Sequence, residues 1–196
     1  MISIHAAALA GGLVFAAAPA LAADTILAQS TFDSDLDGWT STVNGTVSWS
    51  AGGGHPGGRM LFSNDTSDST FVVAPAKFRT GAIDFKKLNN KGYIVFQHEL
   101  VQNGGTGFVA YEIDMTGPGG TAVFTGGLPL NKLNNWQTVV APLVQGNWTV
   151  SGGSWTALLN DVEDIRIRIE LIDGSPDVEA IDNVKIVSHP KGFVPR

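Results

Sequence analysis

The chain of 196 residues is long enough for one domain with a substantial hydrophobic core. Its hydrophobic content of 43% is too high for a disordered protein, and its net charge of −6 provides no basic surface for nucleic acid or anionic membranes. Cysteine is absent, which excludes disulfides, Cys-based zinc sites and thiol nucleophiles.

The first 22 residues differ in composition from the rest of the chain. Residues 6–22 carry no charge and end in Ala-Pro-Ala-Leu-Ala, with Ala20 and Ala22 in the small-residue pattern of a cleavage site. We therefore predict a signal peptide over residues 1–22, and a secreted or periplasmic mature chain without a membrane span. The start contains His5 but no Lys or Arg. The alternative is an N-terminal membrane anchor, although the apolar run is shorter than the ~20 residues that a span needs.

Beyond the signal peptide, short alternating segments are separated by clusters of Gly, Asn, Asp and Pro, which is typical of a β-sandwich. We predict a short lead over residues 23–30, one domain over residues 31–187 and a C-terminal tail over residues 188–196. The domain opens with T-F-D-S-D-L-D-G-W at 31–39 and closes with A-I-D-N-V-K-I at 180–186. These two segments are predicted to pair, so that the two ends of the chain meet.

Strands are predicted between these two ends. They lie at residues 46–50, 69–74, 92–100, 107–114, 121–124, 136–140 and 165–171. One segment has helical spacing instead: Ser154 is a suitable N-cap for residues 154–163, whose apolar residues recur every three or four positions. The sequence therefore predicts an all-β protein, an antiparallel β-sandwich of jelly-roll type with one short helix before the penultimate strand.

Several of these segments resemble a known family. The run T-F-V-V-A-P-A-K-F-R-T-G at 70–81, Trp136, N-W-T at 147–149 and I-R-I-R-I-E-L at 165–171 resemble the laminin IV (laminin B) domain. The two ends of the chain look like those of galactose-binding-like jelly rolls, which include many carbohydrate-binding modules. The resemblance implies an extracellular binding or scaffolding module, with a structural calcium where the ends meet. The chain lacks the Cys-rich repeats that flank laminin domains.

A calcium site is also suggested by the acidic residues. Alternation places Asp182 on the same face as Val184 and Ile186, the expected core face, where an unpaired carboxylate would cost several kcal/mol. A cation shared with Asp33 would satisfy it, and the alternative is that Asp182 accepts backbone N–H bonds. The spacing of the opening acids matches only the first half of an EF-hand loop, because Asn44 stands where a Glu is required.

No catalytic constellation is evident, and we assign no catalytic residue. His98 lies beside Glu99 on a predicted strand, but neighbouring strand residues face opposite ways, so we expect His98 to be a satisfied core or edge histidine. Glu112 and Glu170 are the candidate pair for glycoside hydrolysis, although solvated strand faces explain both.

Aromatic residues are the best candidates for a glycan site, because the apolar face of a sugar stacks on an aromatic ring. Trp49 and Trp148 border loops and are predicted ligand-binding residues, whereas Trp39, Trp136 and Trp155 are assigned to core packing.

A polar row is the other ligand candidate. Arg166, Arg168 and Glu170 alternate with isoleucines and are predicted to line a groove on an outward face, or to form a solvated face. We expect a monomeric, non-catalytic module for an extracellular or envelope glycan, with calcium as a structural cofactor. The alternatives are an extracellular protein partner in adhesion or envelope structure, and a small glycan-active hydrolase or lyase.

Overall fold

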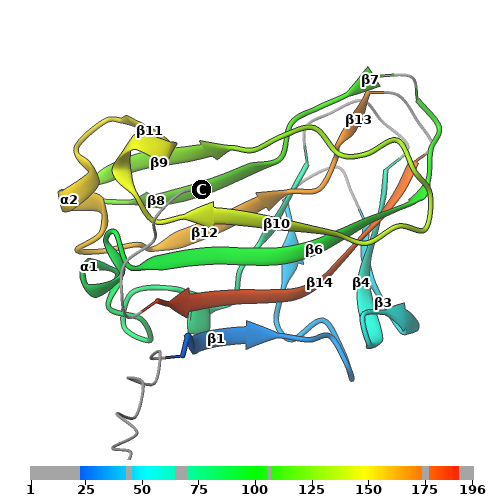
Figure 1. Ribbon diagram of the computed structural model, residues 1–196, viewed down its shortest axis with the longest axis horizontal. Helices are drawn as coiled ribbons and strands as arrows, with labels where there is room; N and C mark the ends of the chain where they lie inside the picture. The colour runs from blue at the N-terminus through cyan, green and yellow to red at the C-terminus, as the bar shows by residue number, and fades with distance from the viewer. Residues whose placement is uncertain (1–22, 43–45, 65–69, 106, 174–176, 190–196) are drawn as a thin grey trace, which may run out of the picture.

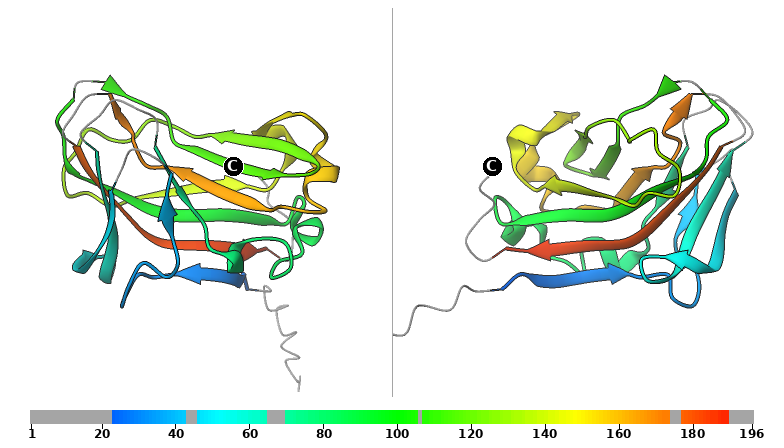
Figure 2. Two further views of the ribbon diagram at one scale, coloured as in Figure 1. Left: turned by 180° about the vertical axis from the view of Figure 1, so that it is seen from behind. Right: turned by 45° about the vertical axis from the view of Figure 1, so that its right-hand side comes forward.

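The computed structural model describes residues 23–42, 46–64, 70–105, 107–173 and 177–189, so the predicted signal peptide and most of the predicted tail lie outside the described residues. Two antiparallel sheets face each other (Figures 1 and 2). This confirms the predicted all-β sandwich. No helix in the described part of the chain has the length and apolar character needed to cross a membrane.

Sheet A has six strands, in the order β10-β6-β14-β4-β3 with β1 also paired to β14, and its strands β6, β14 and β1 run along the lower part of Figure 1. Its strands are β1 (Thr25–Ser30), β3 (Thr46–Gly54), β4 (Gly57–Asn64), β6 (Gly92–Gln102), β10 (Gln137–Pro142) and β14 (Asp177–Ser188). β14 is the centre of this sheet because it pairs with β6 along one edge and with β4 and then β1 along the other.

Sheet B follows the order β11-β9-β8-β12-β5-β2. Its strands are β2 (Thr40–Ser41), β5 (Phe71–Val73), β8 (Glu112–Gly117), β9 (Gly120–Thr125), β11 (Trp148–Ser151) and β12 (Asp164–Arg168). A two-stranded ribbon of β7 (Gly107–Phe108) and β13 (Ile172–Asp173) lies at one end of the sandwich (Figure 1).

Helices are short and lie at the other end of the sandwich. They are α1 (Phe85–Leu88), α2 (Trp155–Leu158) and the 3-10 turns η1 (Ala76–Phe78) and η2 (Gln145–Asn147). The predicted helix is α2, which the Ser154 side chain caps by accepting a hydrogen bond from the N–H of Ala157 at 3.2 Å. α2 precedes β12, which is the third strand from the C-terminus because β13 intervenes before β14.

The two ends of the chain meet as predicted, but through a different segment. β1 pairs with β14 from Thr25 opposite Ser188 to Ser30 opposite Val184, so the sheet begins inside the predicted lead. Residues 31–39 form a loop instead of a strand, because Phe32, Asp37 and Gly38 have positive φ angles that interrupt an extended backbone. Phe32 and Trp39 nevertheless anchor this loop in the core, each at 2% exposure.

The core fills the space between the sheets with aliphatic and aromatic side chains from both layers. Trp39 packs edge-on against Phe78 at 5.4 Å between ring centroids, and Trp148 packs against Trp155 at 5.7 Å. The packing roles predicted for Trp39 and Trp155 are therefore confirmed.

Candidate functional site

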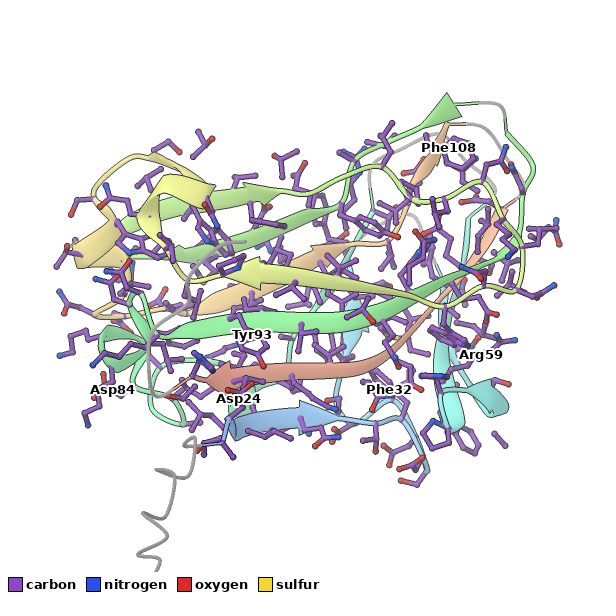
Figure 3. The ribbon with its side chains drawn as sticks, in the orientation of Figure 1. Asp24, Phe32, Arg59, Asp84, Tyr93 and Phe108 are labelled. Carbon is purple, nitrogen blue, oxygen red and sulfur yellow. The ribbon has the colours of Figure 1, made fainter. Side chains whose placement is uncertain are left out.

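An open hollow lies on the outer face of sheet A, which we call the sheet A face. It has a volume of about 370 Å³, and it lies where the β3–β4 turn meets β6, β14 and β10. Its lining residues are His55, Pro56, Val95, Gln97, Thr138, Asn183 and Lys185. The alternate residues of β6, Ile94 and Phe96, are buried in the core, which fixes the outward direction of Val95 and Gln97. Figure 3 labels Tyr93 on β6 and Arg59 on β4, which lie far apart along this sheet.

A β-bulge in β14 shapes the hollow. Asp182 lies opposite Gln97 and Lys185 lies opposite Val95, so β14 contains one more residue than β6 across this interval. The bulge is made at Asn183, which has a φ of 52°. Asn tolerates this left-handed conformation better than most residues. The prediction that Asp182 shares the core face with Val184 is therefore wrong, because the bulge shifts the alternation and leaves Asp182 on the outer side with Gln97.

Asp182 is nevertheless fully buried, because the β3–β4 turn covers it. Its two carboxylate oxygens accept the backbone N–H groups of His55 and Asn183, both at 2.6 Å. Burial raises the pKa of Asp182 above its ordinary value, and the two backbone hydrogen bonds oppose that rise. Asp182 therefore ties the turn to the bulge.

Asp33 approaches the same turn from the opening loop. A Cβ on Gly57 would clash with its Oδ1 atom, and its negative charge contributes to the raised pKa of Asp182. The predicted pair of carboxylates is therefore close together. However, no group of three or more His, Cys, Asp or Glu side chains suited to a metal ion occurs in the described part of the chain. The backbone bonds of Asp182 match the alternative interpretation, and calcium stays a prediction.

A polar network covers the floor of the hollow. The Nδ1 atom of His55 lies 2.8 Å from Nε2 of Gln97, and the side-chain amide of Asn183 donates to Oε1 of Gln97 at 2.9 Å and to the backbone carbonyl of His55. The imidazole of His55 stacks on the indole of Trp136 with 6.3 Å between ring centroids and 30° between planes. The network therefore joins β6 and β14 to the β3–β4 turn and places an aromatic ring beside the hollow.

Trp136 is the residue that the sequence interpretation missed. It was assigned to core packing, but it is half-buried next to the start of β10, where Val139 and Ala141 face the core. The signal was present in the alternation Trp136, Thr138, Val140, which places the indole on the same face as a polar residue.

The two predicted ligand-binding tryptophans lie elsewhere. Trp49 is 39% exposed, but it pairs with buried Met60 and therefore lies on the opposite side of sheet A from the hollow. Its Nε1 atom donates to the carbonyl of Phe32 at 2.6 Å. Trp148 is only 6% exposed and donates to the carbonyl of Pro142, so its ring is packed in the core and has no face free for a sugar.

The predicted polar row does not form as a row. Arg166 and Arg168 lie on the outer face of sheet B and contact acids there: Arg166 Nε donates to Asp164 at 2.7 Å, and Arg168 Nη1 lies 3.6 Å from Glu112. Glu170 is 3% exposed, because β12 ends at Arg168 and the alternation ends with it. The structure therefore places no member of this row at the hollow.

A buried polar cluster occupies the interior near the β7–β13 ribbon. His98 is 1% exposed, as predicted for a core histidine, with Nδ1 at 2.9 Å from the Tyr111 hydroxyl and Nε2 at 3.4 Å from Glu179. Glu179 also accepts the N–H of Leu171 at 2.9 Å. Asp177 is 1% exposed, and burial together with the charge of Glu179 raises its pKa to about 7.

Comparisons with known proteins support the fold. No known family model matches the chain, and no curated protein matches it. Among solved structures, a xylan-binding domain of carbohydrate-binding module family 22 aligns with a TM-score of 0.56 and 14% identity over 90% of this chain and 100% of that chain. A family 22 xylan-binding domain from Paenibacillus barcinonensis Xyn10C aligns with a TM-score of 0.54 and 12% identity, over 85% and 97% of the two chains.

A third structure is a family 11 carbohydrate-binding module from Clostridium thermocellum, in complex with a β-1,3-1,4-mixed-linked tetrasaccharide. It aligns with a TM-score of 0.52 and 17% identity over 85% of this chain and 96% of that chain. The L4b domain of human laminin α2 aligns with a TM-score of only 0.49 and 11% identity, over 65% of this chain and 78% of that chain. This alignment carries no argument for the laminin resemblance. The chain therefore has the jelly-roll fold of the carbohydrate-binding modules.

Proposed function

We propose that this protein is an exported, non-catalytic glycan-binding module that binds its ligand on the sheet A face. The observation that carries the proposal is the open hollow, with amide side chains on its floor and the Trp136 indole beside it. Its volume of about 370 Å³ falls within the range of small-ligand sites, ~300–1,000 Å³. The shared fold with carbohydrate-binding modules supports the ligand class but does not identify it.

The chemistry of the hollow suits a sugar. Sugar hydroxyls both donate and accept hydrogen bonds, and the amides of Gln97 and Asn183 offer both functions. The C–H face of a pyranose would stack on Trp136, while Val95 provides a small apolar contact. The bulge and the His55 contacts hold these groups in place before a ligand arrives, which lowers the cost of binding.

Binding fits the hollow better than glycan hydrolysis. Hydrolysis commonly uses two carboxyl groups on either side of the bond that is cleaved. The residues that line the hollow contribute none, and nearby Glu99 is 5% exposed and paired with Arg59. The candidate pair Glu112 and Glu170 is divided between the outer face of sheet B and the interior. A hydrolase or lyase would release reducing sugar from a glycan that the protein binds, and we expect no release.

Export and the monomeric state are parts of the same proposal. The apolar composition of residues 6–22 and the small residues Ala20 and Ala22 support signal-peptide cleavage before Ala23. The mature N-terminal sequence after expression with the leader is the direct check of this point.

A protein partner is the second candidate function, and one observation favours it. The segment between β9 and β10 exposes three leucines: Leu128 at 62%, Leu130 at 56% and Leu133 at 48%. Clustered apolar side chains on a surface often mark protein contacts. This second function would be supported if the protein bound no glycan and if changing these leucines to serine abolished its binding to a partner protein.

Replacing Trp136 with Ala is expected to weaken glycan binding about tenfold or more, because stacking of a sugar on an indole is worth at least about 1.4 kcal/mol. The measurement is isothermal titration calorimetry of residues 23–196 with the best ligand from a glycan panel. Trp49→Ala is the matched control, since Trp49 is 39% exposed but lies on the other side of the sheet. Loss of binding in the Trp49 variant alone would move the site to β3.

Calcium at the meeting point of the chain ends is a separate prediction. If an ion joins Asp33 to Asp182, a chelator should lower the melting temperature of residues 23–196, and added calcium should restore it. The Asp33→Ala variant should then melt at the same temperature with and without chelator. A melting temperature of the wild-type chain that chelator leaves unchanged would remove the ion and leave the backbone hydrogen bonds as the only partners of Asp182.

A further inference from the structure

Lys185 is a half-buried cation in the wall of the hollow. It lies on β14, opposite Val95 on β6 and opposite Gln29 on β1. Within the part of the chain that the structure describes, no carboxylate forms an ion pair with Lys185. The other half-buried lysine of that part, Lys77, is paired with Asp37. Lys185 therefore brings to the hollow a positive charge that has no ion-pair partner in the described part of the chain, in a protein whose net charge is −6.

Among the described residues, none of the acids around the hollow forms an ion pair with Lys185. Asp182 lies beneath the His55 turn with each oxygen bonded to a backbone N–H, and Glu99 is paired with Arg59. Asp33 accepts the hydroxyl of Thr31 at 2.7 Å on the opening loop. The seven residues lining the hollow include two basic side chains, His55 and Lys185, and no acid. The lining therefore offers a negatively charged ligand a cationic partner and no anionic side chain.

We propose that the hollow selects an acidic sugar, whose carboxylate or sulfate ester contacts the Lys185 ammonium while its ring reaches Trp136. This inference rests on the proposed function and assigns the ligand class of the same site. The Thr138 hydroxyl lies on the neighbouring strand, opposite Gln97, and can donate a further hydrogen bond to the anionic group. Lys185 and Thr138 both lie on strands of sheet A, so the backbone that carries them is in place before binding.

The experiment compares three oligosaccharide probes by calorimetry: an oligogalacturonate, a sulfated galactan oligosaccharide and a neutral xylo-oligosaccharide of similar length. We expect an acidic probe to bind the wild-type chain at least about tenfold more tightly than the neutral one, and raising the salt to weaken only acidic binding. Lys185→Gln should reduce that affinity about tenfold, and Lys185→Arg should retain most of it. Lys132→Gln removes an exposed lysine of the β9–β10 segment and is the matched control.

The outcomes separate this inference from the proposed function. Preference for the galacturonate identifies a carboxylate, and preference for the sulfated probe identifies a sulfate ester. Equal binding of neutral and acidic probes, or an acidic preference that survives Lys185→Gln in a folded variant, would overturn the inference. The glycan-binding proposal would still stand in both cases if Trp136→Ala abolished binding. Absence of binding by all three probes and by a wider glycan panel would remove both.

Discussion

Replacing Asp182 with Ala is expected to lower the free energy of unfolding by about 3 kcal/mol and to abolish binding at the sheet A face. The carboxylate accepts two backbone N–H groups at 2.6 Å while fully buried, and each donor left without a partner costs about 1–3 kcal/mol. The same bonds tie the turn that carries His55 to the bulge that carries Asn183. Stability and binding should therefore fall together.

The measurements are urea unfolding at pH 7 and calorimetry with the best glycan. Asp182→Asn keeps one acceptor oxygen and should give an intermediate loss of stability, because its amide N–H₂ would face a backbone donor. Asp161→Ala is the matched control, since Asp161 is exposed between α2 and β12. A loss for Asp182→Ala no larger than that of the control would contradict the role of Asp182 as the anchor of the turn.

The protein is expected to be about 2 kcal/mol more stable at pH 5.5 than at pH 8. Asp177 is buried near Glu179 and Glu170, and its pKa in the folded state rises to about 7 from an ordinary value of 3.8. Between these two values the folded state holds a proton that the unfolded state has released, so stability falls as the pH rises and levels off above pH 7. From pH 5.5 to 7, a span of about 1.5 pH units, the free energy of unfolding falls by about 1.36 kcal/mol per unit, which gives about 2 kcal/mol in total.

Asp177→Asn should remove most of this dependence and raise the stability at pH 8. The raised pKa values of Asp114, to about 6 through burial, and of Glu99, also through burial, act in the same direction and remain in the variant. Urea titrations at pH 5.5, 6.5 and 8 test the slope, with Asp161→Asn as the control. A wild-type protein that is more stable at pH 8 than at pH 5.5 would contradict this assignment.

Alternation predicted the sheets well, because each long strand buries one face. Residues such as Ile94 and Phe96 on β6, or Ile165 and Ile167 on β12, lie in the core as their spacing predicts. The prediction that the two chain ends meet is also confirmed, although β1 supplies the pairing segment.

The site could not be predicted from alternation in the same way, because local irregularities of the strands determine which side chains line it. The bulge after Asp182 reverses the alternation within one residue, and a single sequence shows no sign of where such a residue is inserted. The end of β12 at Arg168 removes Glu170 from the predicted row for a similar reason. Proximity to a loop was a poor guide for Trp148, whose ring packs between the sheets. The core assignment was a poor guide for Trp136, which is only half-buried.

The most direct measurement of the central claim is an amide chemical-shift titration of ¹⁵N-labelled residues 23–196 with the tightest oligosaccharide of the uronate, sulfated and xylan probes. If the sheet A face is the glycan site, the shifts should concentrate on His55, Gln97, Thr138, Asn183 and Lys185, together with the indole N–H of Trp136. Shifts confined to Arg166 and Arg168 on sheet B, or to the edge near Trp49, would contradict the claim.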